Sequence, residues 1–260
     1  MTVAPVTLTA VPGIPAIGPR DDLADILGAA LAAAAMTPGS GDVLVVAQKI
    51  VSKAEGRVVD LKDVTPSARA RELAKQVDKD PRLVELILRE SSEVVAHKPG
   101  VLVVAHKLGF VLANAGIDRS NVAPPSNSEP DSEPVLLLPV DPNASAAALK
   151  ARLGAHFGVA LGVVVSDSVG RAWRNGITGI ALGAAGLPAL RDLIGRTDLF
   201  GRRLEVTQTG FADEIAAAAS LVMGQADEGL PAVLVSGLSW REPESDATAL
   251  LRPKDQDLFR

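Results

Sequence analysis

Asp42-Val43-Leu44-Val45-Val46-Ala47 is the stretch that decides the fold, because a run of apolar, largely β-branched residues is typical of a strand buried on both faces. A second apolar run, Val159 to Val165, leads directly into Ser166-Asp167-Ser168. The two runs predict the buried centre of a sheet, with polar residues placed where the second strand ends.

Helices and further strands are expected on both sides of these runs. Acidic residues precede the first helix and a proline begins the third, and both features favour helix starts. Helix and strand mix without a regular βαβ repeat, and several strands are close enough in sequence to pair antiparallel. We therefore expect an α+β fold with mixed and antiparallel sheets. The expected helices are 23–35, 67–77, 81–90 and 144–157, and the further strands are 6–10, 94–96, 101–106 and 110–113.

The composition bounds the class of protein. The chain has 260 residues, 47% of them apolar, which suits one large domain or two joined lobes. Its net charge of −5 and its lack of a basic block argue against a nucleic-acid partner. Since it has no cysteine, it has no disulfide, thiolate metal site or cysteine nucleophile. We find no leader peptide and no apolar stretch long enough to span a membrane, so we expect a soluble, cytoplasmic protein.

Two aspartates stand where apolar strands are expected to end. Asp118 closes a polar, glycine-containing turn after the strand expected at 110–113, and Asp167 follows the second buried run. Carboxylates at strand ends can converge on one point, and their oxygens are ligands that Mg²⁺ and Mn²⁺ prefer. An aspartate also commonly caps a helix or a turn, so spacing alone leaves both interpretations open.

Basic residues gather around the same segments. Arg119 follows the first aspartate, and Arg171 and Arg174 follow the second. Guanidinium groups suit phosphate and carboxylate oxygens, although a single arginine is as often an ordinary surface residue. Lys49 and Lys53 lie four residues apart after the first buried run and can reach phosphate in the same way.

Familiar nucleotide-binding signatures are missing. The chain has neither a G-x-x-x-x-G-K-[ST] loop nor a strand-anchored G-x-G-x-x-G. We interpret a run of four spaced glycines as sites of close backbone packing instead of a phosphate loop. Trp173 either stacks on a planar ligand or belongs to the core, and the core is the commoner place. The four glycines are Gly176, Gly179, Gly183 and Gly186.

Five stretches in order along the chain carry a family resemblance. They are Val11-Pro12-Gly13-Ile14-Pro15, Val51-Ser52-Lys53-Ala54-Glu55-Gly56-Arg57, the stretch 113–121 that contains Asp118, the stretch 167–176 that begins with Asp167, and Ala212-Asp213-Glu214-Ile215 with the following 223–232. Together they resemble the coenzyme F420-0:L-glutamate ligase family, also called F420 γ-glutamyl ligases. The resemblance runs from Leu8 to Trp240. Position 172 is alanine where the family often has proline, and position 168 is serine where threonine also occurs.

The resemblance implies a reaction and an assembly. Such ligases join L-glutamate to coenzyme F420-0 and consume GTP, with an acyl phosphate as the intermediate, and further glutamates follow through γ-linkages. Phosphoryl transfer of this kind needs a divalent metal and cationic groups more than a protein nucleophile. The implied fold is a two-lobed α+β fold peculiar to the family, as an intertwined homodimer. The implied domain covers 1–245, followed by a charged tail, 246–260.

The resemblance also implies roles for particular residues. Asp118 and Asp167 would be the catalytic pair. The metal, Mg²⁺ or Mn²⁺ with K⁺ as a further candidate, would be held by Asp118, Asp167, Ser168 and Gln225. GTP would contact Gly13, Ile14, Pro15, Ala16, Gln48, Lys49, Lys53, Asn121, Met223, Gly224, Gln225, Ala226, Asp227, Glu228, Gly229 and Leu230.

Two other functions stay open at this point. One is a metal-dependent nucleotide hydrolase or phosphotransferase on the same scaffold, which would use the same aspartates but no deazaflavin pocket. The other is a non-catalytic nucleotide-binding or scaffolding protein. The sequence leaves undecided how many glutamates are added, which F420-0 variant is accepted, which metal serves in the cell, and what the polar loop Pro125 to Pro134 does.

Overall fold

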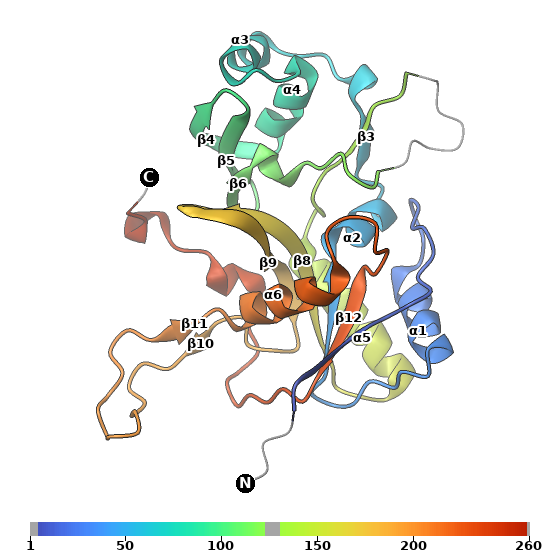
Figure 1. The fold of residues 1–260 in the computed structure, drawn as a ribbon, viewed down its shortest axis with the longest axis vertical. Helices are drawn as coiled ribbons and strands as arrows, with labels where there is room; N and C mark the ends of the chain where they lie inside the picture. Colours follow the sequence, from blue (N-terminus) through green and yellow to red (C-terminus); the bar gives the residue numbers. More distant parts are fainter. Residues whose placement is uncertain (1–4, 123–130, 259–260) are drawn as a thin grey trace.

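The computed structural model describes residues 5–122 and 131–258, so most of the polar loop from Pro125 to Pro134 lies outside the described residues. A five-stranded sheet forms the centre (Figure 1). The strand β2 is parallel to β8, and every other pair in the sheet is antiparallel. The mixed sheet confirms the α+β class. Its order is β1 (Thr7–Ala10), β12 (Ala232–Ser236), β2 (Val43–Ala47), β8 (Gly162–Arg171) and β9 (Arg174–Ala185).

Helices cover both faces of this sheet. Three of them, α1 (Leu23–Ala33), α2 (Gln48–Ala54) and α5 (Pro142–Phe157), share one buried cluster with alternate residues of β2 and β8. On the other face, α6 (Phe211–Met223) packs against the remaining alternate residues. A strand that is buried on both faces is apolar throughout, and this pattern is why the sequence predicted the strand at Val43 correctly.

A second hydrophobic core lies above the central sheet in Figure 1. It joins a three-stranded antiparallel sheet to two helices at the expected positions. A short antiparallel pair, β3 with β7, runs beside it. The elements are η1 (Leu61–Asp63), α3 (Ala68–Val77), α4 (Pro81–Arg89), β4 (Ser91–Lys98), β5 (Val101–His106), β6 (Val111–Ala113), η2 (Asn114–Gly116), β3 (Val58–Asp60) and β7 (Pro134–Leu136).

The second buried run differs from its prediction at both ends. The strand starts at Gly162, not Val159, and continues through Asp167 to Arg171. It continues because β9, an element that the sequence did not predict, pairs with β8 along the full length of a long hairpin. The expectation that Asp167 follows the end of a strand is therefore wrong: the aspartate lies inside β8.

Close packing explains three of the four spaced glycines. A Cβ on Gly183 would lie 2.1 Å from a carbonyl oxygen of α5, and one on Gly179 would lie 2.4 Å from a carbonyl oxygen of α6. At Gly186 a Cβ would lie 2.8 Å from a backbone oxygen. Gly176 is the exception, because it faces open space and instead has a positive φ of 86°. Both helices thus rest directly on the backbone of β9.

The last part of the chain is fixed to the body and carries an arm. The arm runs between β10 (Arg191–Asp192) and β11 (Gln208–Thr209) and projects from the lower left of Figure 1. Two short helices come after β12, η3 (Ala247–Leu250) and η4 (Lys254–Gln256), and Ala247 is buried in the core. In the described part of the chain, no helix combines the length and the apolar character needed to cross a bilayer.

Candidate active site

Asp118 is positioned by a turn of left-handed backbone. Asn114, Ala115 and Gly116 all have positive φ, and a Cβ on Gly116 would lie 2.8 Å from the side chain of Leu138. The chain then pairs with β7, since the backbone N–H of Asp118 donates to the Leu136 carbonyl at 3.0 Å and its carbonyl accepts at 2.8 Å. The backbone of Asp118 is therefore held in place by the turn before it and by its own pairing with β7.

Asp167 is positioned by the central sheet. The neighbour β2 ends at Ala47, opposite Ser166, while β8 continues beside β9. A bulge interrupts the β8–β9 register just before Ser166, and such bulges re-aim the side chains that follow. The parallel pairing of β2 with β8 thus ends at Ala47 and Ser166, and Asp167 is the first residue of β8 beyond that pairing.

A cavity of about 610 Å³ contains both aspartates. It brings together the metal-site and nucleotide-site residues that the sequence proposed, except Gly13, which is not among the described residues that line it. Ser120, Ser166 and Ile177 also line it and were missed. The proposed residues around the cavity are Ile14, Pro15, Ala16, Gln48, Lys49, Lys53, Asp118, Asn121, Asp167, Ser168, Met223, Gly224, Gln225, Ala226, Asp227, Glu228, Gly229 and Leu230.

Lys49 is the basic partner of Asp118. Its ammonium group forms an ion pair with Asp118 and donates to the hydroxyl oxygen of Ser120 at 2.7 Å and to the Ser120 carbonyl at 3.2 Å. The backbone N–H of Ser120 in turn donates to Asp118 at 2.7 Å. The motif around Asp118 therefore binds a lysine from α2 that lines the cavity.

A second set of contacts joins three walls of the cavity. Lys53 donates to the Asn121 carbonyl at 2.7 Å, and the Asn121 amide donates to the Ala226 carbonyl at 3.0 Å. Burial, with the nearby charge of Lys49, lowers the pKa of Lys53. Helix α2, the segment after Asp118 and the loop after α6 are thus linked in one polar chain.

The two aspartates have opposite electrostatic settings. Burial raises the pKa of Asp167 to about 6, and the negative charge of Asp118 adds to the rise while Lys49 opposes it. Burial also acts to raise the pKa of Asp118, but hydrogen bonds from Lys49 and Ser120 outweigh it, so that pKa lies below its ordinary value. Asp118 is compensated by its lysine, whereas no cation among the described residues forms an ion pair with Asp167.

Gln48 brings a buried amide to the same place. It is only 1% exposed, and its side-chain oxygen accepts from Ser52 at 2.8 Å. In the described part of the chain its Nε2 has no hydrogen-bond partner of normal geometry, although it is close enough to Asp167 to lower the pKa of that aspartate. A buried donor left open at a cavity wall is suited to a ligand oxygen.

The residues present fit a divalent cation with oxygen ligands. Two carboxylates close enough to repel each other, the Ser168 hydroxyl and the Gln225 amide are hard oxygen donors of the kind that Mg²⁺ and Mn²⁺ take. A bound cation would also place a second positive charge, besides that of Lys49, near Asp167. Within the described ranges, no group of three or more histidine, cysteine, aspartate or glutamate side chains comes together, so hydroxyl, amide, water or ligand oxygens must complete any such site.

The arginines and the tryptophan expected near these aspartates lie elsewhere. Arg119 forms an ion pair with Glu133 at 3.1 Å, and Arg171 and Arg174 are exposed at the far end of the β8–β9 hairpin. Trp173 is 82% exposed, so the expectation that it belongs to the core is wrong. The β8–β9 hairpin carries Arg171, Trp173 and Arg174 away from the cavity, whereas Arg119 turns outward to its ion pair with Glu133.

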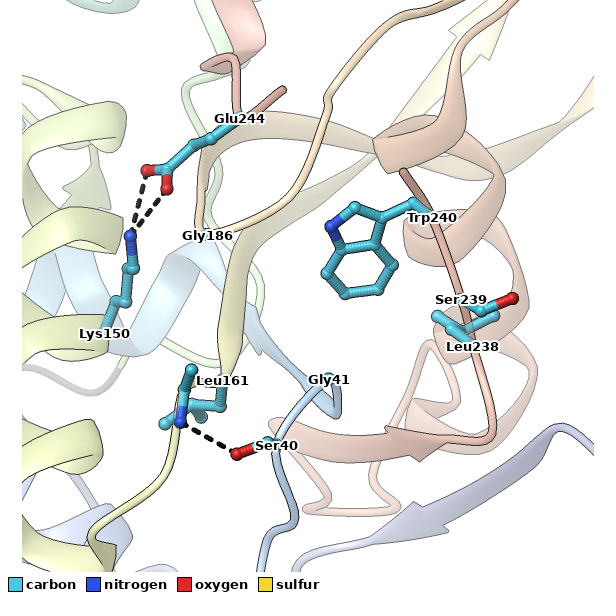
Figure 2. A pocket seen from close by; sticks show the side chains of 10 residues that line it. Ser40, Gly41, Lys150, Leu161, Gly186, Leu238, Ser239, Trp240 and Glu244 are labelled. Carbon is cyan, nitrogen blue, oxygen red and sulfur yellow. Dashed lines mark hydrogen bonds and ion pairs between the residues drawn. The ribbon is translucent and has the colours of Figure 1, made fainter. Parts of the chain in front are cut away.

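A second cavity, of about 460 Å³, opens at the opposite ends of β2 and β8. Figure 2 shows Lys150 and Glu244 paired across it, at 2.8 Å, and Trp240 facing the same space. Ser40 accepts from the backbone N–H of Ala160 at 3.3 Å. Since its charged groups are already paired with each other, this cavity is less suited to an anionic ligand than the one that holds the aspartates.

A polar cavity lined by two lysines and two aspartates, at the edge where the parallel pairing of two central strands ends, is typical of an enzyme that handles an anionic ligand together with a metal. The F420-0:gamma-glutamyl ligase family model matches residues 13–237, and the chain belongs to this family.

Relatives of known name agree with the family. The chain is 44% identical over 257 residues to the coenzyme F420:L-glutamate ligase of Methanothermobacter thermautotrophicus, covering 98% of this chain and 99% of the relative. Enzymes with the same name from Methanopyrus kandleri and Archaeoglobus fulgidus are 43% and 42% identical, over 94% and 96% of this chain and 93% and 94% of the relatives. The resemblance read from the five motifs is thereby confirmed.

Proposed function

We propose that this protein is a GTP-dependent ligase that joins L-glutamate to coenzyme F420-0 through an acyl phosphate. The observation that carries the proposal is the convergence of Asp118 and Asp167 with Lys49 and Lys53 on one cavity. The names of the relatives support the acceptor and the amino acid. Further γ-linked glutamates remain part of the proposal.

The chemistry explains why such a site suffices. The F420-0 carboxylate attacks the γ-phosphorus of GTP, which releases GDP and leaves an acyl phosphate. The α-amine of glutamate then attacks the acyl carbon, an amide bond forms, and inorganic phosphate leaves. The first step brings several negative charges together, so cations and fixed donors lower its barrier more than a nucleophile from the protein would.

Each wall of the cavity has a task in this scheme. Lys49 exchanges its bond to Asp118 for a phosphate oxygen, and Lys53 approaches the same phosphates from the next turn of α2. The Gln48 amide offers its open N–H to the nucleotide. Asp118 and Asp167 would hold Mg²⁺ or Mn²⁺ with Ser168 and Gln225, and the cation would neutralise phosphate charge; K⁺ is a further candidate ion.

We also propose a homodimer of this ligase in the cytoplasm. The tip of the β10–β11 arm offers Leu199 and Phe200, which are 98% and 95% exposed, and aromatic and aliphatic residues so placed suit an interface. Replacing both by aspartate is expected to give monomers by analytical ultracentrifugation. An unchanged molecular mass would show that the arm is not part of the dimer interface.

A coupled assay tests the ligase. The protein is incubated with F420-0, L-glutamate, GTP and Mn²⁺, and product mass and GDP are followed together. A glutamate increment matched by GDP supports the ligase, whereas GTP loss without any increment supports the hydrolase or phosphotransferase alternative. Asp118→Asn and Asp167→Asn should each abolish the increment, and the exposed Asp63→Asn should retain it.

A further inference from the structure

Arg57 belongs to one of the five sequence stretches, yet the proposed chemistry gives it no task. It is not among the described residues that line the cavity. Its backbone N–H donates to the Ser52 carbonyl at 2.9 Å. Gly56, with a positive φ of 71°, donates to the Lys53 carbonyl at 3.0 Å. These two bonds form a Schellman motif, so the backbone of Arg57 is fixed to the end of α2, the helix that carries Lys49.

The side chain of Arg57 crosses from α2 to two other segments. Its Nε donates to the Leu138 carbonyl at 2.9 Å, and its Nη2 donates to Glu90 at 2.5 Å. Glu90 directly follows α4, and its own carbonyl accepts from the N–H of Lys107 at 3.0 Å. The Arg57 carbonyl also accepts from the N–H of Leu137, at 3.0 Å. One guanidinium group therefore ties the end of α2 to the second hydrophobic core, in a fork that a lysine cannot reproduce.

Leu138 connects this arginine to Asp118. Its side chain is 1% exposed and packs against the turn before the aspartate, where a Cβ on Gly116 would come within 2.8 Å of it. Two residues earlier, Leu136 exchanges both backbone hydrogen bonds with Asp118, at 3.0 and 2.8 Å. The short segment from Leu136 to Leu138 is thus bonded to Asp118 at one end and to Arg57 at the other.

Arg57 is the charged partner of Glu90. His106 is the other basic side chain near this carboxylate, with 3.9 Å between its Nε2 and the Glu90 oxygen. Its Nδ1 accepts from the N–H of Leu108 at 3.0 Å, and the residue is only 4% exposed. Burial lowers the pKa of His106; Arg57 and Lys107 lower it further, while Glu90 opposes them. A histidine that is neutral at pH 7 does not compete with Arg57 for the carboxylate.

Lys49 and Asp118 belong to different hydrophobic cores. Helix α2 packs through Ile50 into the core of the central sheet, whereas Ile117, next to the aspartate, packs into the second core. In the proposed reaction Lys49 exchanges Asp118 for a phosphate oxygen, so the ion pair that joins the two cores is lost when the nucleotide binds. Arg57 provides a link between them that does not involve the cavity.

We propose that Arg57 is a positioning residue for the metal site, because it fixes Asp118 relative to α2 and thus relative to Asp167. The proposal rests on the ligase function, since the site concerned is that of the ligase. Arg57 acts through the segment that ends at Leu138 and touches no ligand itself. Its loss should therefore weaken metal binding without removing any metal ligand.

Calorimetric titration of the protein with Mn²⁺ in the absence of GTP, together with ligase kinetics, tests this assignment. Arg57→Met should raise the Kd for Mn²⁺ about 10-fold, because loss of a group that orients a metal ligand typically weakens binding roughly 10- to 100-fold. Arg57→Lys keeps a charge beside Glu90 and should raise it about threefold. The KM for Mn²⁺ should rise with the Kd, while kcat at saturating Mn²⁺ changes less than about twofold, because the bound ion itself then holds Asp118.

Arg191→Met is the matched control. The side chain of Arg191 is 25% exposed, against 24% for Arg57, and it pairs with Glu242 at 3.3 Å. It lies 5.0 Å from the ring of Phe211, the first residue of α6, whereas the cavity is lined by the last turn of that helix. Arg191→Met should lose stability in urea and bind Mn²⁺ normally. If Arg57→Met behaves in the same way, with a lower apparent kcat and an unchanged KM and Kd for Mn²⁺, Arg57 only stabilises the fold and the proposal is wrong.

Two milder variants keep the comparison open if Arg57→Met does not fold. Arg57→Lys and Glu90→Gln should each raise the Kd for Mn²⁺ about threefold, and unchanged values in both would also overturn the proposal. Failure of the ligase function looks different. An unaltered protein that binds Mn²⁺ but adds no glutamate overturns the ligase function alone, because the comparison of Kd values still holds. An unaltered protein that binds no Mn²⁺ overturns both.

Discussion

The two aspartates of the cavity are expected to affect stability in opposite directions. Asp167 has a pKa raised from 3.8 to about 6, so its ionisation disfavours the folded state. Asp118 has a lowered pKa, so its ionisation favours the folded state. The folded state binds the Asp167 proton more tightly than the unfolded state, so the free energy of unfolding decreases as the pH rises through about 6. The folded state binds the Asp118 proton less tightly, so the contribution of Asp118 to the free energy of unfolding is lost as the pH falls below 3.8.

The magnitude follows from the same values. Each tenfold change in proton affinity corresponds to about 1.4 kcal/mol, so a rise from 3.8 to about 6 sets an upper limit of about 3 kcal/mol. Solvent screening at this partly exposed side chain reduces the expected gain of Asp167→Asn to about 1–2 kcal/mol near neutral pH. Asp118→Asn breaks the pair with Lys49 and should lose about 1 kcal/mol.

Urea unfolding in EDTA, at about pH 5 and about pH 7.5, measures both effects. The gain from Asp167→Asn should shrink at the lower pH, because about nine-tenths of Asp167 in the unaltered protein is then protonated. Added Mn²⁺ should stabilise the unaltered protein but not Asp167→Asn. The reasoning is refuted if Asp167→Asn is less stable at neutral pH, or if its gain is independent of pH. Asp63→Asn serves as the exposed control.

Two other substitutions test the cavity and the fold. Lys49→Met should bind Mn²⁺ several-fold more tightly in the absence of GTP, because the lysine no longer competes for Asp118. The Kd of the same variant for GTP should rise about 10-fold or more. Weaker Mn²⁺ binding, measured by calorimetry, would contradict this reasoning. Gly183→Ala should lower the free energy of unfolding, measured in urea, by about 3 kcal/mol, because the new Cβ would lie 2.1 Å from a backbone oxygen. Gly170→Ala, where the new Cβ meets open space, should lower it by less than about 0.5 kcal/mol. Equal effects of the two substitutions would contradict the packing argument.

The sequence predicted those elements whose pattern is local. The run at Val43–Ala47 and the helices Ala68–Val77 and Pro81–Arg89 have unambiguous apolar periodicity and end signals, and the structure confirms them. The strand β9 escaped prediction because its glycines and alanines carry little strand preference of their own. It is a strand because β8 pairs with it and because α5 and α6 pack on its glycines.

The site was predictable where a motif keeps its residues adjacent. Asp118 and Asn121 line the cavity together, but Arg119 between them turns outward to Glu133. Ser120 was missed because a serine in a polar turn gives no signal, and only its bond to Lys49 reveals its place. Which neighbour of an aspartate faces the cavity depends on pairing with β7, which spacing in the sequence does not encode.

The free energy needed to bury the Asp167 carboxylate is offset by the buried valines that precede it in the same strand. Val163, Val164 and Val165 are fully buried between helices on both faces, and β2 and β9 bond to them from both sides. Burial of one such side chain contributes roughly 1.5–3 kcal/mol, so three of them exceed the penalty of the carboxylate that follows. A carboxylate on a mobile loop would move into water and lose its raised pKa. The apolar run at the centre of the sheet is therefore what keeps Asp167 in a position where a cation is favoured.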